Sequence, residues 1–505
     1  MLTSKPSRFY RAAIATPMEI ELKLALDARH AVRLRLHPLL AGIKPSARVL
    51  HSVYFDTPDF ALMRRAIAFR LRRLGYHWVQ TLKAEAPAVG ALSSRPEWEM
   101  PVAGSAPDLA ILPAEALELL RGIEPARLAP VFVTEFRRTT WRLQGAGGAA
   151  ELALDQGTIR AGTAERPISE VEIELLDGDP EALFDWALGL LEHLPLRVEP
   201  RSKAERGYFL CGAAQPAPVR AGRPDLRAGQ PAAQAWQEIV RSALSQLVAN
   251  VPGFLEQADD IEYLHQLRIA LRRLRGAAAL GDGVGKARPA WAADLAAVMQ
   301  DLNPARDWDV FVQETLPSVR PVLGDPPLCE SFLSGVGTTA ARAREQAQAC
   351  IAAPDFTRLV LSIGRDLQAA RAAGAPVEDW AGRILGRRWK NLRRQCRRLD
   401  ELDAAGRHRL RIAAKKLRYA ADALEGLYGK RARSFLKRLA ALQDRLGRAN
   451  DAVVADWLLQ EVHRRDAGAA YDAGRFSGAL RERSGHHHAE DEVAWRRMTD
   501  AQKFW

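Results

Sequence analysis

The spacing of apolar side chains changes once along the chain, and this change limits the possible folds more than any other feature. From Met18 to about Leu210, short runs alternate apolar and polar residues, with Gly, Pro and Asp between them, a pattern typical of β-strands. From about residue 232 onward, long segments rich in Ala, Leu and Arg have the periodicity of helices instead. We therefore expect an α+β multi-domain chain, a mainly antiparallel β domain followed by an all-α domain.

Composition marks the place where these two domains meet. Residues 213–231 are rich in Pro, Gly, Ala and Arg and have neither period, as is common in inter-domain linkers. We predict a β domain over residues 18–212, a linker over 213–231 and a helical domain over 232–505. Residues 1–17 are predicted to be an N-terminal extension.

The balance of charge indicates the class of partner. The chain has 73 Lys and Arg against 61 Asp and Glu, a formal net charge of +12. An excess of positive charge favours polyanions such as phosphates, nucleic acid or an acidic membrane surface.

Cysteine content and hydropathy indicate the compartment. Only four cysteines occur in 505 residues, at positions 211, 329, 350 and 396, which is too few for a disulfide framework and favours a reducing compartment. No apolar run reaches the length of about 18 residues that a transmembrane helix needs. We therefore expect a cytoplasmic protein without a membrane partner.

Several predicted strands have a charged face. Glu19, Glu21 and Lys23 share one face of the first strand, opposite Ile20 and Leu22. Further on, single strands present one sign of charge only. Carboxylates share a face at Glu170, Glu172 and Glu174 and again at Glu97 and Glu99, whereas cations share a face at Arg70 and Arg72.

Rows of like charge need counter-ions, because two unit charges about 5 Å apart repel by roughly 3 kcal/mol at an effective dielectric constant of about 20. Carboxylate rows are suited to hard divalent cations, Mg²⁺ or Mn²⁺. Cation rows are suited to a multiply charged anion such as a chain of phosphates. A sheet closed around both would be a barrel with a polar interior.

The residues that carry these charges resemble the ordered motifs of the CYTH family, the triphosphate tunnel metalloenzymes. Glu19-Ile-Glu21-Leu-Lys23 is similar to the ExExK signature that opens that family. Later motifs follow in the family's order: Tyr54-Phe55-Asp56-Thr57, Arg70-Leu71-Arg72, Gln80-Thr81-Leu82-Lys83, Arg95-Pro96-Glu97-Trp98-Glu99, Arg138-Thr139-Thr140-Trp141, Leu152-Ala153-Leu154-Asp155, Glu170-Val171-Glu172-Ile173-Glu174 and Ser202-Lys203.

This resemblance implies an eight-stranded antiparallel β tunnel that hydrolyses triphosphates with a divalent metal, Mg²⁺ or Mn²⁺. By position, it implies that Glu19, Glu21, Glu172 and Glu174 hold the metal. It implies that Lys23, Arg70, Arg72, Lys83, Arg95, Arg138 and Lys203 hold phosphates. Lys23, Glu170 and Glu172 are the expected catalytic residues, and the carboxylate that takes the proton of the attacking water stays open.

The helical half contains an internal repeat. His265-Gln-Leu-Arg268 returns 143 residues later as His408-Arg-Leu-Arg411, which indicates two related helical halves. In each copy four cations recur at the spacing of one helix face, with no acidic residue among them: His265, Arg268, Arg272 and Arg275, and then His408, Arg411, Lys415 and Arg418. The candidate binding cations, with one from a second repeated motif, are His265, Arg268, Arg272, Arg273, Arg275, Arg306, His408, Arg411, Lys415, Lys416 and Arg418.

These paired basic helices resemble the CHAD family, an all-α domain that often follows CYTH and is associated with binding inorganic polyphosphate. The resemblance implies that the cations just named bind polyphosphate. One departure from the repeat is Arg306, which becomes Asn450 in the second half, so the two ends of the groove are expected to differ in affinity.

The function that follows is metal-dependent hydrolysis of inorganic triphosphate (tripolyphosphate) in the tunnel, with long-chain polyphosphate bound by the helical domain. Two alternatives remain open: a non-catalytic polyphosphate-binding or targeting protein, and an enzyme acting on an organic triphosphate, either thiamine triphosphate or ATP as an adenylate cyclase. Nucleic acid is not an expected partner, because aromatic stacking platforms and DNA-binding motifs are absent from the sequence.

Overall fold

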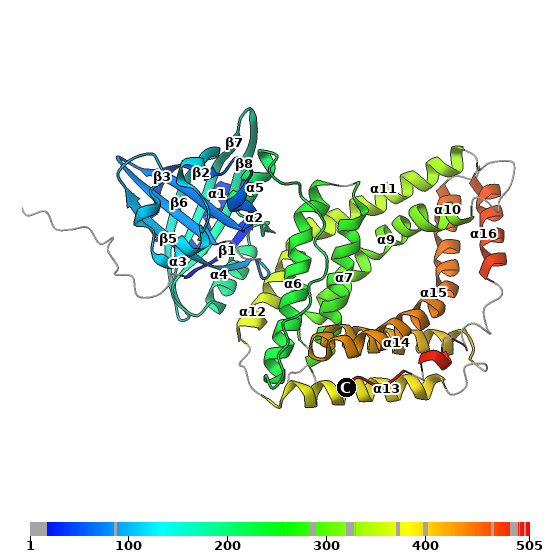
Figure 1. Ribbon diagram of the computed structural model, residues 1–505. Coiled ribbons are helices and arrows are strands. Elements are labelled where there is room, and N and C mark those ends of the chain that lie inside the picture. Colours follow the sequence, from blue (N-terminus) through cyan, green and yellow to red (C-terminus); the bar gives the residue numbers. More distant parts are fainter. Residues whose placement is uncertain are drawn as a thin grey trace, which may run out of the picture. The chain divides into compact units, whose positions relative to one another are not determined.

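The computed structural model describes residues 18–84, 88–257, 259–281, 289–319, 328, 330–369, 374–396, 402–465, 469–484, 493, 495–498 and 501–505. The predicted extension, residues 1–17, lies outside the described residues. The chain forms two compact units, Met1–Ala217 and Pro218–Trp505, called here the barrel unit and the helical unit (Figure 1). In the part of the chain that is described, no helix has the length and apolar character needed to cross a membrane.

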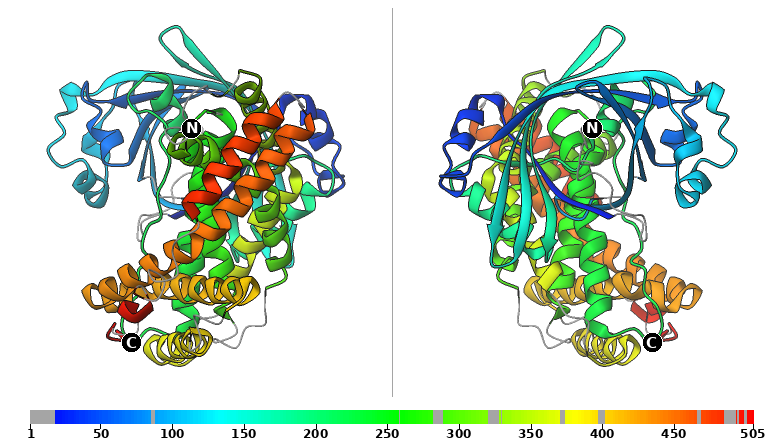
Figure 2. Two further views of the ribbon diagram at one scale, coloured as in Figure 1. Left: turned by 90° about the vertical axis from the view of Figure 1, so that its right-hand side faces the viewer. Right: turned by 90° about the vertical axis from the view of Figure 1, so that its left-hand side faces the viewer.

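The barrel unit is one antiparallel sheet closed on itself. Its strands are β1 (Met18–Ala25), β2 (Ser46–Asp56), β3 (Ile67–Leu74), β4 (His77–Ala84), β5 (Leu92–Val102), β6 (Ala129–Gly145), β7 (Gly148–Ala161), β8 (Ala164–Gly178) and the short β9 (Arg197–Val198). The order β5-β4-β3-β2-β6-β7-β8-β1-β9, with β5 also paired to β1, closes an eight-stranded barrel. Figure 2 shows the blue and cyan strands curving around its interior. The prediction of an eight-stranded antiparallel β tunnel is confirmed.

Alternation along the strands gives the barrel a charged interior and an apolar exterior. On β3, Arg70 and Arg72 face the interior, while Phe69 and Leu71, both 0% exposed, pack in an outer apolar cluster with Leu82. A second apolar cluster includes Tyr54, Ala68 and Ala204, which line the cavity, so apolar packing lies on both faces of the sheet. Helices and 3₁₀ turns connect and cover the strands. They are η1 (Ala28–His30), α1 (Ala31–Arg35), η2 (Pro38–Leu40), α2 (Ala61–Arg64), η3 (Leu109–Ile111), α3 (Ala114–Leu119), η4 (Pro125–Arg127), α4 (Glu181–Leu191) and α5 (Lys203–Leu210).

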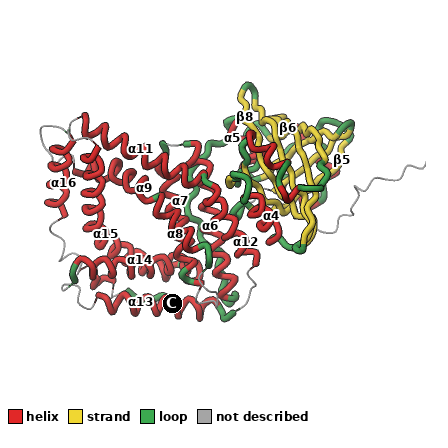
Figure 3. The backbone as a smooth tube through the Cα atoms, turned by 180° about the vertical axis from the view of Figure 1, so that it is seen from behind, coloured by secondary structure: helices red, strands yellow, loops and turns green. Residues whose placement is uncertain are grey.

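Among its described residues, the helical unit has helices and loops but no strand, as Figure 3 shows, apart from one isolated β-bridge between Pro231 and Pro376. Its elements are α6 (Ala232–Glu256), α7 (Ile261–Ala278), α8 (Ala292–Asp301), α9 (Asn303–Val310), the π-helix η6 (Phe311–Thr315), α10 (Leu316–Val319), α11 (Glu330–Ala352), α12 (Pro354–Ala369), α13 (Val377–Gln395), α14 (Ala404–Tyr428), α15 (Lys430–Arg465) and α16 (Ala470–Ser484). Helices α7 and α14, which carry the repeated sequence, contact one another. The expected all-α region is confirmed.

Part of the segment predicted as a linker is bound to the helical unit. The backbone N–H of Val219 donates to the Asn250 side chain, and the Asn250 amide donates back to the Val219 carbonyl, both at 2.9 Å. Further along, Arg273 donates to the carbonyl oxygen of Gly222 at 2.8 Å. Residues after Pro218 therefore have fixed partners on α6 and α7.

Candidate active site

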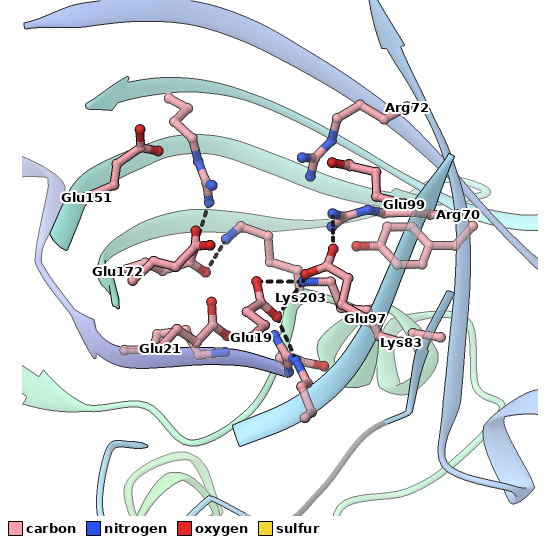
Figure 4. Close-up of a pocket in the computed structure, with 18 of the residues that line it drawn as sticks. Glu19, Glu21, Arg70, Arg72, Lys83, Glu97, Glu99, Glu151, Glu172 and Lys203 are labelled. Atoms are coloured by element: carbon pink, nitrogen blue, oxygen red, sulfur yellow. Dashed lines mark hydrogen bonds and ion pairs between the residues drawn. The ribbon is translucent and has the colours of Figure 1, made fainter. Parts of the chain in front are cut away.

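The barrel encloses a charged cavity of about 260 Å³ (Figure 4). Its lining includes eight cationic side chains and seven carboxylates, so the charges nearly cancel. The cations are Lys23, Arg48, Arg70, Arg72, Lys83, Arg95, Arg138 and Lys203, and the carboxylates are Glu19, Glu21, Glu97, Glu99, Glu151, Glu172 and Glu174. Such a site can bind an anion and a cation together, because the anion can replace the carboxylates around the basic side chains and the cation can replace the basic side chains around the carboxylates.

Sheet register sets which charges meet. Glu21 on β1 is directly opposite Glu174 on β8, and Lys23 is opposite Glu172. On the other edge of β1, Glu19 is opposite Arg95 of β5, where the barrel closes. The period-two pattern therefore brings residues from both ends of the domain sequence to one place.

One group of ion pairs is centred on Glu19. The Lys83 ammonium lies 2.7 Å from Glu19 and 3.0 Å from Glu97. The Arg95 guanidinium lies 3.0 Å from Glu19 and 2.6 Å from Glu21. Burial alone would raise the pKa of Glu19, but Lys83 and Arg95 together hold that pKa below its ordinary value.

A second group surrounds the ammonium of Lys203, at the start of α5. Its Nζ lies 2.7 Å from Asp155, 2.8 Å from Glu172 and in contact with Glu170. Carboxylate oxygens of these three residues lie within 4.8 Å of one another, and Arg138 binds Asp155 with two hydrogen bonds of 2.6 and 2.7 Å. The centre of this carboxylate group is therefore filled by an ammonium, and Lys203 acts there as the counter-ion.

Three carboxylates of the cavity are less well balanced. Burial raises the pKa of Glu21 and of Glu97, and nearby carboxylates add to the effect. Burial and then Glu19 raise the pKa of Glu174 to about 7. In the described part of the chain, no hydrogen bond or ion pair reaches the Glu174 carboxylate. Since Glu21 and Glu174 are cross-strand neighbours of like charge, the pair is destabilising without a cation between them.

In the helical unit, the cations of α7 lie close to those of α9 and α14. Arg268 donates to Oδ1 of Asn303 at 2.8 Å and lies 3.8 Å from Asp307. Burial, together with Arg272 and Arg306, lowers the pKa of Arg268 to about 10. Burial also lowers the pKa of Arg272, helped by Arg306 and by Arg418 of α14. Two helices of the repeat therefore place their basic faces side by side.

Comparisons with known families match this division. The CYTH domain family matches residues 17–208, and the CHAD domain family matches residues 238–460. The chain is a CYTH–CHAD protein. Both resemblances predicted from the sequence are confirmed.

Two relatives illustrate the two halves. The inorganic triphosphatase of Haemophilus influenzae is 35% identical over 199 residues, which are 38% of this chain and 54% of that protein. The chain thus matches about half the length of that curated relative. The crystal structure of the CHAD domain from the plant Ricinus communis is 32% identical, with a TM-score of 0.51 over 57% of this chain and 98% of that chain.

The CYTH domain brings together every residue predicted for its site except one. Glu170 is 1% exposed and is not among the residues that line the cavity. It lies in the wall, against Lys203 and Arg206. The other residues expected to bind metal or phosphate all line the cavity.

Sequence reasoning missed four charged lining residues, Arg48, Glu97, Glu99 and Glu151. The signal for Glu97 and Glu99 was present, because they share a strand face inside a recognised motif. Arg48 has the same parity as Tyr54 on β2 and pairs across to Arg138 on β6, and Glu151 pairs to Glu174. Alternation along the full lengths of β2 and β7 would have predicted that both side chains face the interior of the barrel.

In the CHAD domain, the predicted cations do not all share one environment. Arg273 donates to Gln246, Ser242 and Gly222 at 2.7, 2.8 and 2.8 Å, so its guanidinium is committed to α6 and the preceding segment. Lys416, its counterpart in the repeat, is exposed. The side chain of Asn450, expected to weaken one end of the groove, lies outside the described residues.

The carboxylates of the CYTH domain fit a hard divalent cation. Glu21 and Glu174 oppose one another across β1 and β8, both with a raised pKa, and all their donors are oxygen atoms, as Mg²⁺ and Mn²⁺ prefer. Glu19 adjoins them on the same strand face. The Lys203 group fits a metal less well, because an ammonium already contacts all three of its carboxylates.

Proposed function

We propose that the CYTH domain hydrolyses inorganic triphosphate to diphosphate and phosphate with Mg²⁺ or Mn²⁺ bound. The observation that carries this proposal is the cavity lined by eight cations and seven carboxylates. A triphosphate carries several negative charges along a short chain, and side chains from six strands and α5 would surround it with matching positive charge. The Haemophilus relative, named an inorganic triphosphatase, supports the same substrate.

Substrate would enter by exchange of ion-pair partners. Lys83 and Arg95 now bind Glu19, and Arg138 and Lys203 bind Glu172. Phosphate oxygens would replace these carboxylates around the cations. The metal, held by Glu19, Glu21, Glu172 and Glu174, would supply charge neutralisation and orientation at the phosphates.

Hydrolysis then forms one bond from a water oxygen to the terminal phosphorus and breaks the bond from that phosphorus to the diphosphate oxygen. The proton of the water passes to a carboxylate of the glutamate cluster. Negative charge moves onto the diphosphate, where the fixed arginines and lysines stabilise it because they need no reorganisation.

The experiment that tests this proposal compares Glu21→Gln with Glu135→Gln. Glu21 is 4% exposed inside the cavity, so its neutral amide should abolish Mg²⁺-dependent phosphate release from tripolyphosphate while Glu19 still holds Arg95. Glu135 pairs with Arg160 on the exposed outer face, so Glu135→Gln should leave the rate unchanged. Near-normal turnover of Glu21→Gln at saturating metal would contradict the metal assignment.

The same assay separates the substrate alternatives. Phosphate release is measured from tripolyphosphate, ATP and thiamine triphosphate at equal concentration. A preference for ATP or thiamine triphosphate would replace the inorganic substrate. If none of the three compounds is hydrolysed, the enzymatic functions are excluded, and the alternative of a non-catalytic protein that binds polyphosphate is favoured.

We propose that the CHAD domain binds long-chain polyphosphate along α7 and α14. Burial lowers the pKa of Arg268, helped by Arg272, and burial lowers the pKa of Arg272, helped by Arg418. Cations crowded in this way are stabilised when an anion neutralises them. Arg273 is not part of this surface, because its guanidinium N–H groups already donate to the side chains of Gln246 and Ser242 on α6.

A further inference from the structure

Two buried charges lie behind the cavity wall and touch none of the space that substrate would fill. Glu170 is 1% exposed and Arg206 is 5% exposed, and neither lines the cavity. The Arg206 guanidinium contacts Oε2 of Glu170. Burying an ion pair this deeply has a large desolvation cost. An apolar contact at the same place would avoid that cost.

Lys203 connects this ion pair to the cavity. The other oxygen of Glu170, Oε1, lies against Nζ of Lys203. That ammonium in turn reaches Asp155 at 2.7 Å and Glu172 at 2.8 Å. Of the three carboxylates around Lys203, only Glu172 lines the cavity. The contacts therefore form one line from Arg206 through Glu170 to a cation on the cavity surface.

Helix α5 fixes the two cations of this line relative to one another. Ser202 caps the helix by accepting a hydrogen bond from the Glu205 N–H at 3.0 Å. Lys203 and Arg206 are three residues apart on this helix, so they lie on the same side. Both cations therefore contact Glu170 from the same turn of α5.

Charge is balanced across the group as long as both cations are present. Asp155, Glu170 and Glu172 supply three negative charges, and Arg138, Lys203 and Arg206 supply three positive charges. Without Arg206, the buried Glu170 carboxylate would have Lys203 as its remaining ion-pair partner among the described contacts. It would then draw the ammonium away from the cavity.

We propose that Glu170 and Arg206 are a positioning pair that holds Lys203 at the cavity surface, an inference that rests on the proposed triphosphatase function. Arg206 neutralises Glu170, so that Lys203 is free to face Glu172 and an incoming phosphate. Glu170 is then a positioning residue that touches neither water nor phosphate, in place of the catalytic role expected from the sequence.

A double-mutant cycle on the full-length protein tests the pair. Arg206→Met should raise KM for tripolyphosphate and lower kcat/KM roughly ten- to hundredfold, as small misplacements of binding groups do. In a Lys203→Met background, the same Arg206→Met change should alter kcat/KM by less than about twofold, because its effect passes through Lys203. Removing both charges with Glu170→Gln/Arg206→Met should recover part of the activity that Arg206→Met loses.

The matched control is Arg344→Met. The Arg344 side chain is 13% exposed and lies 2.5 Å from Asp309 in the helical unit, so it is a largely buried arginine–carboxylate pair that is no part of the cavity lining. Its loss should leave KM for tripolyphosphate unchanged. If Arg206→Met alone does not fold, as judged by circular dichroism, the cycle is run with the Glu170→Gln/Arg206→Met pair.

Independent, additive losses for Arg206→Met and Lys203→Met would overturn the positioning role, and so would an equal rise in KM for Arg344→Met. A further loss in Glu170→Gln/Arg206→Met would also overturn it. Absence of tripolyphosphate hydrolysis in the unchanged protein would instead refute the proposed function, which keeps the two failures distinct.

Discussion

At the scale of single residues, the interior of the CYTH barrel is stabilised by ion pairs and destabilised by the carboxylates left over. Arg95 of β5 binds both Glu19 and Glu21, so these two carboxylates share one cation. Glu174 has no such partner among the described residues, and burial raises its pKa to about 7. A divalent cation would remove this imbalance, which is why metal and fold stability should be linked.

The raised pKa of Glu174 gives a pH-dependent stability. Its folded pKa of about 7 lies above the ordinary 4.5, so its contribution to folding is favourable at low pH and is lost as pH rises through 7. The loss amounts to up to about 3 kcal/mol. In metal-free protein, Glu174→Gln should therefore be more stable than the unchanged chain near pH 8 and similar to it near pH 5.

Urea denaturation in the presence of a chelator measures this difference. Glu165→Gln, an exposed partner of Arg160 on β8, is the control and should show no such change with pH. An equal gain for Glu174→Gln at both pH values would show that the carboxylate ionises normally.

Strand parity predicted the lining of the cavity, because an ExExK run can turn only one face inward. It could not predict that Glu170 is covered while Glu172 is not, although the two share a face. Depth along a barrel depends on which segment covers its end. Here Lys203 and Arg206 of α5 lie over Glu170, a contact between residues more than thirty positions apart.

At the scale of secondary-structure elements, a glycine can hide the continuity of a strand. In the sequence, residues 150–155 and 158–162 form two short alternating runs with Gly157 between them, but β7 runs continuously over Gly148–Ala161. Gly157 pairs with Phe136 of β6, and a Cβ there would lie 2.1 Å from the Glu135 carbonyl oxygen. The glycine permits a close approach between strands instead of a turn.

Gly157→Ala should accordingly destabilise the CYTH domain. The added methyl group would force β6 and β7 apart, and overpacking of this kind costs roughly 1–3 kcal/mol. Gly104→Ala, at a position with no atom within 4 Å of the new Cβ, is the matched control and should have little effect. Equal midpoints in urea for both variants would show that the two strands can separate without cost.

The basic helices of the CHAD domain give a second prediction at this scale. Replacing Arg268, Arg272, Lys415 and Arg418 with Ala should greatly weaken binding of long-chain polyphosphate and scarcely change tripolyphosphate hydrolysis. A linear polyanion releases counter-ions when cations neutralise it, so affinity should also fall by orders of magnitude between about 50 and 200 mM salt if about six or more phosphates are contacted.

The control removes the same charge from another helix. Arg383, Arg387, Lys390 and Arg394 are exposed along α13, and their replacement with Ala should leave most of the affinity intact. Titration of polyphosphate against both variants compares them. Equal losses would assign the binding to net charge alone, and tighter binding of duplex DNA would favour a nucleic-acid partner.

At the scale of the whole molecule, the change from period-two to helical periodicity predicted the division into two kinds of structure. The barrel and helical units have separate boundaries at Ala217 and Pro218. Composition could not show that residues after Pro218 bind α6 and α7, because a Pro- and Gly-rich segment has no periodicity whether it is free or packed. Its partners, such as Asn250, lie on an amphipathic helix whose sequence gives no sign of them.

The organisation predicts that catalysis needs the CYTH domain alone. Every residue that lines the cavity lies between Glu19 and Ala204, and the apolar clusters on the two faces of the sheet are built from residues of the same unit. A fragment of residues 18–212 keeps α5, with Lys203, Arg206 and the Tyr208 hydroxyl that donates to Asp56 at 3.0 Å. It should therefore fold and hydrolyse tripolyphosphate with a kcat/KM close to that of the full chain.

Phosphate release with Mg²⁺ checks this fragment, and the same fragment carrying Glu21→Gln provides the inactive reference. The fragment should have lost affinity for long-chain polyphosphate, because α7 and α14 are absent from it. A fragment that melts cooperatively but does not hydrolyse tripolyphosphate would mean that the CHAD domain completes the active site. In that case the charge balance inside the barrel would be insufficient for catalysis, and the two activities could not be assigned to separate domains.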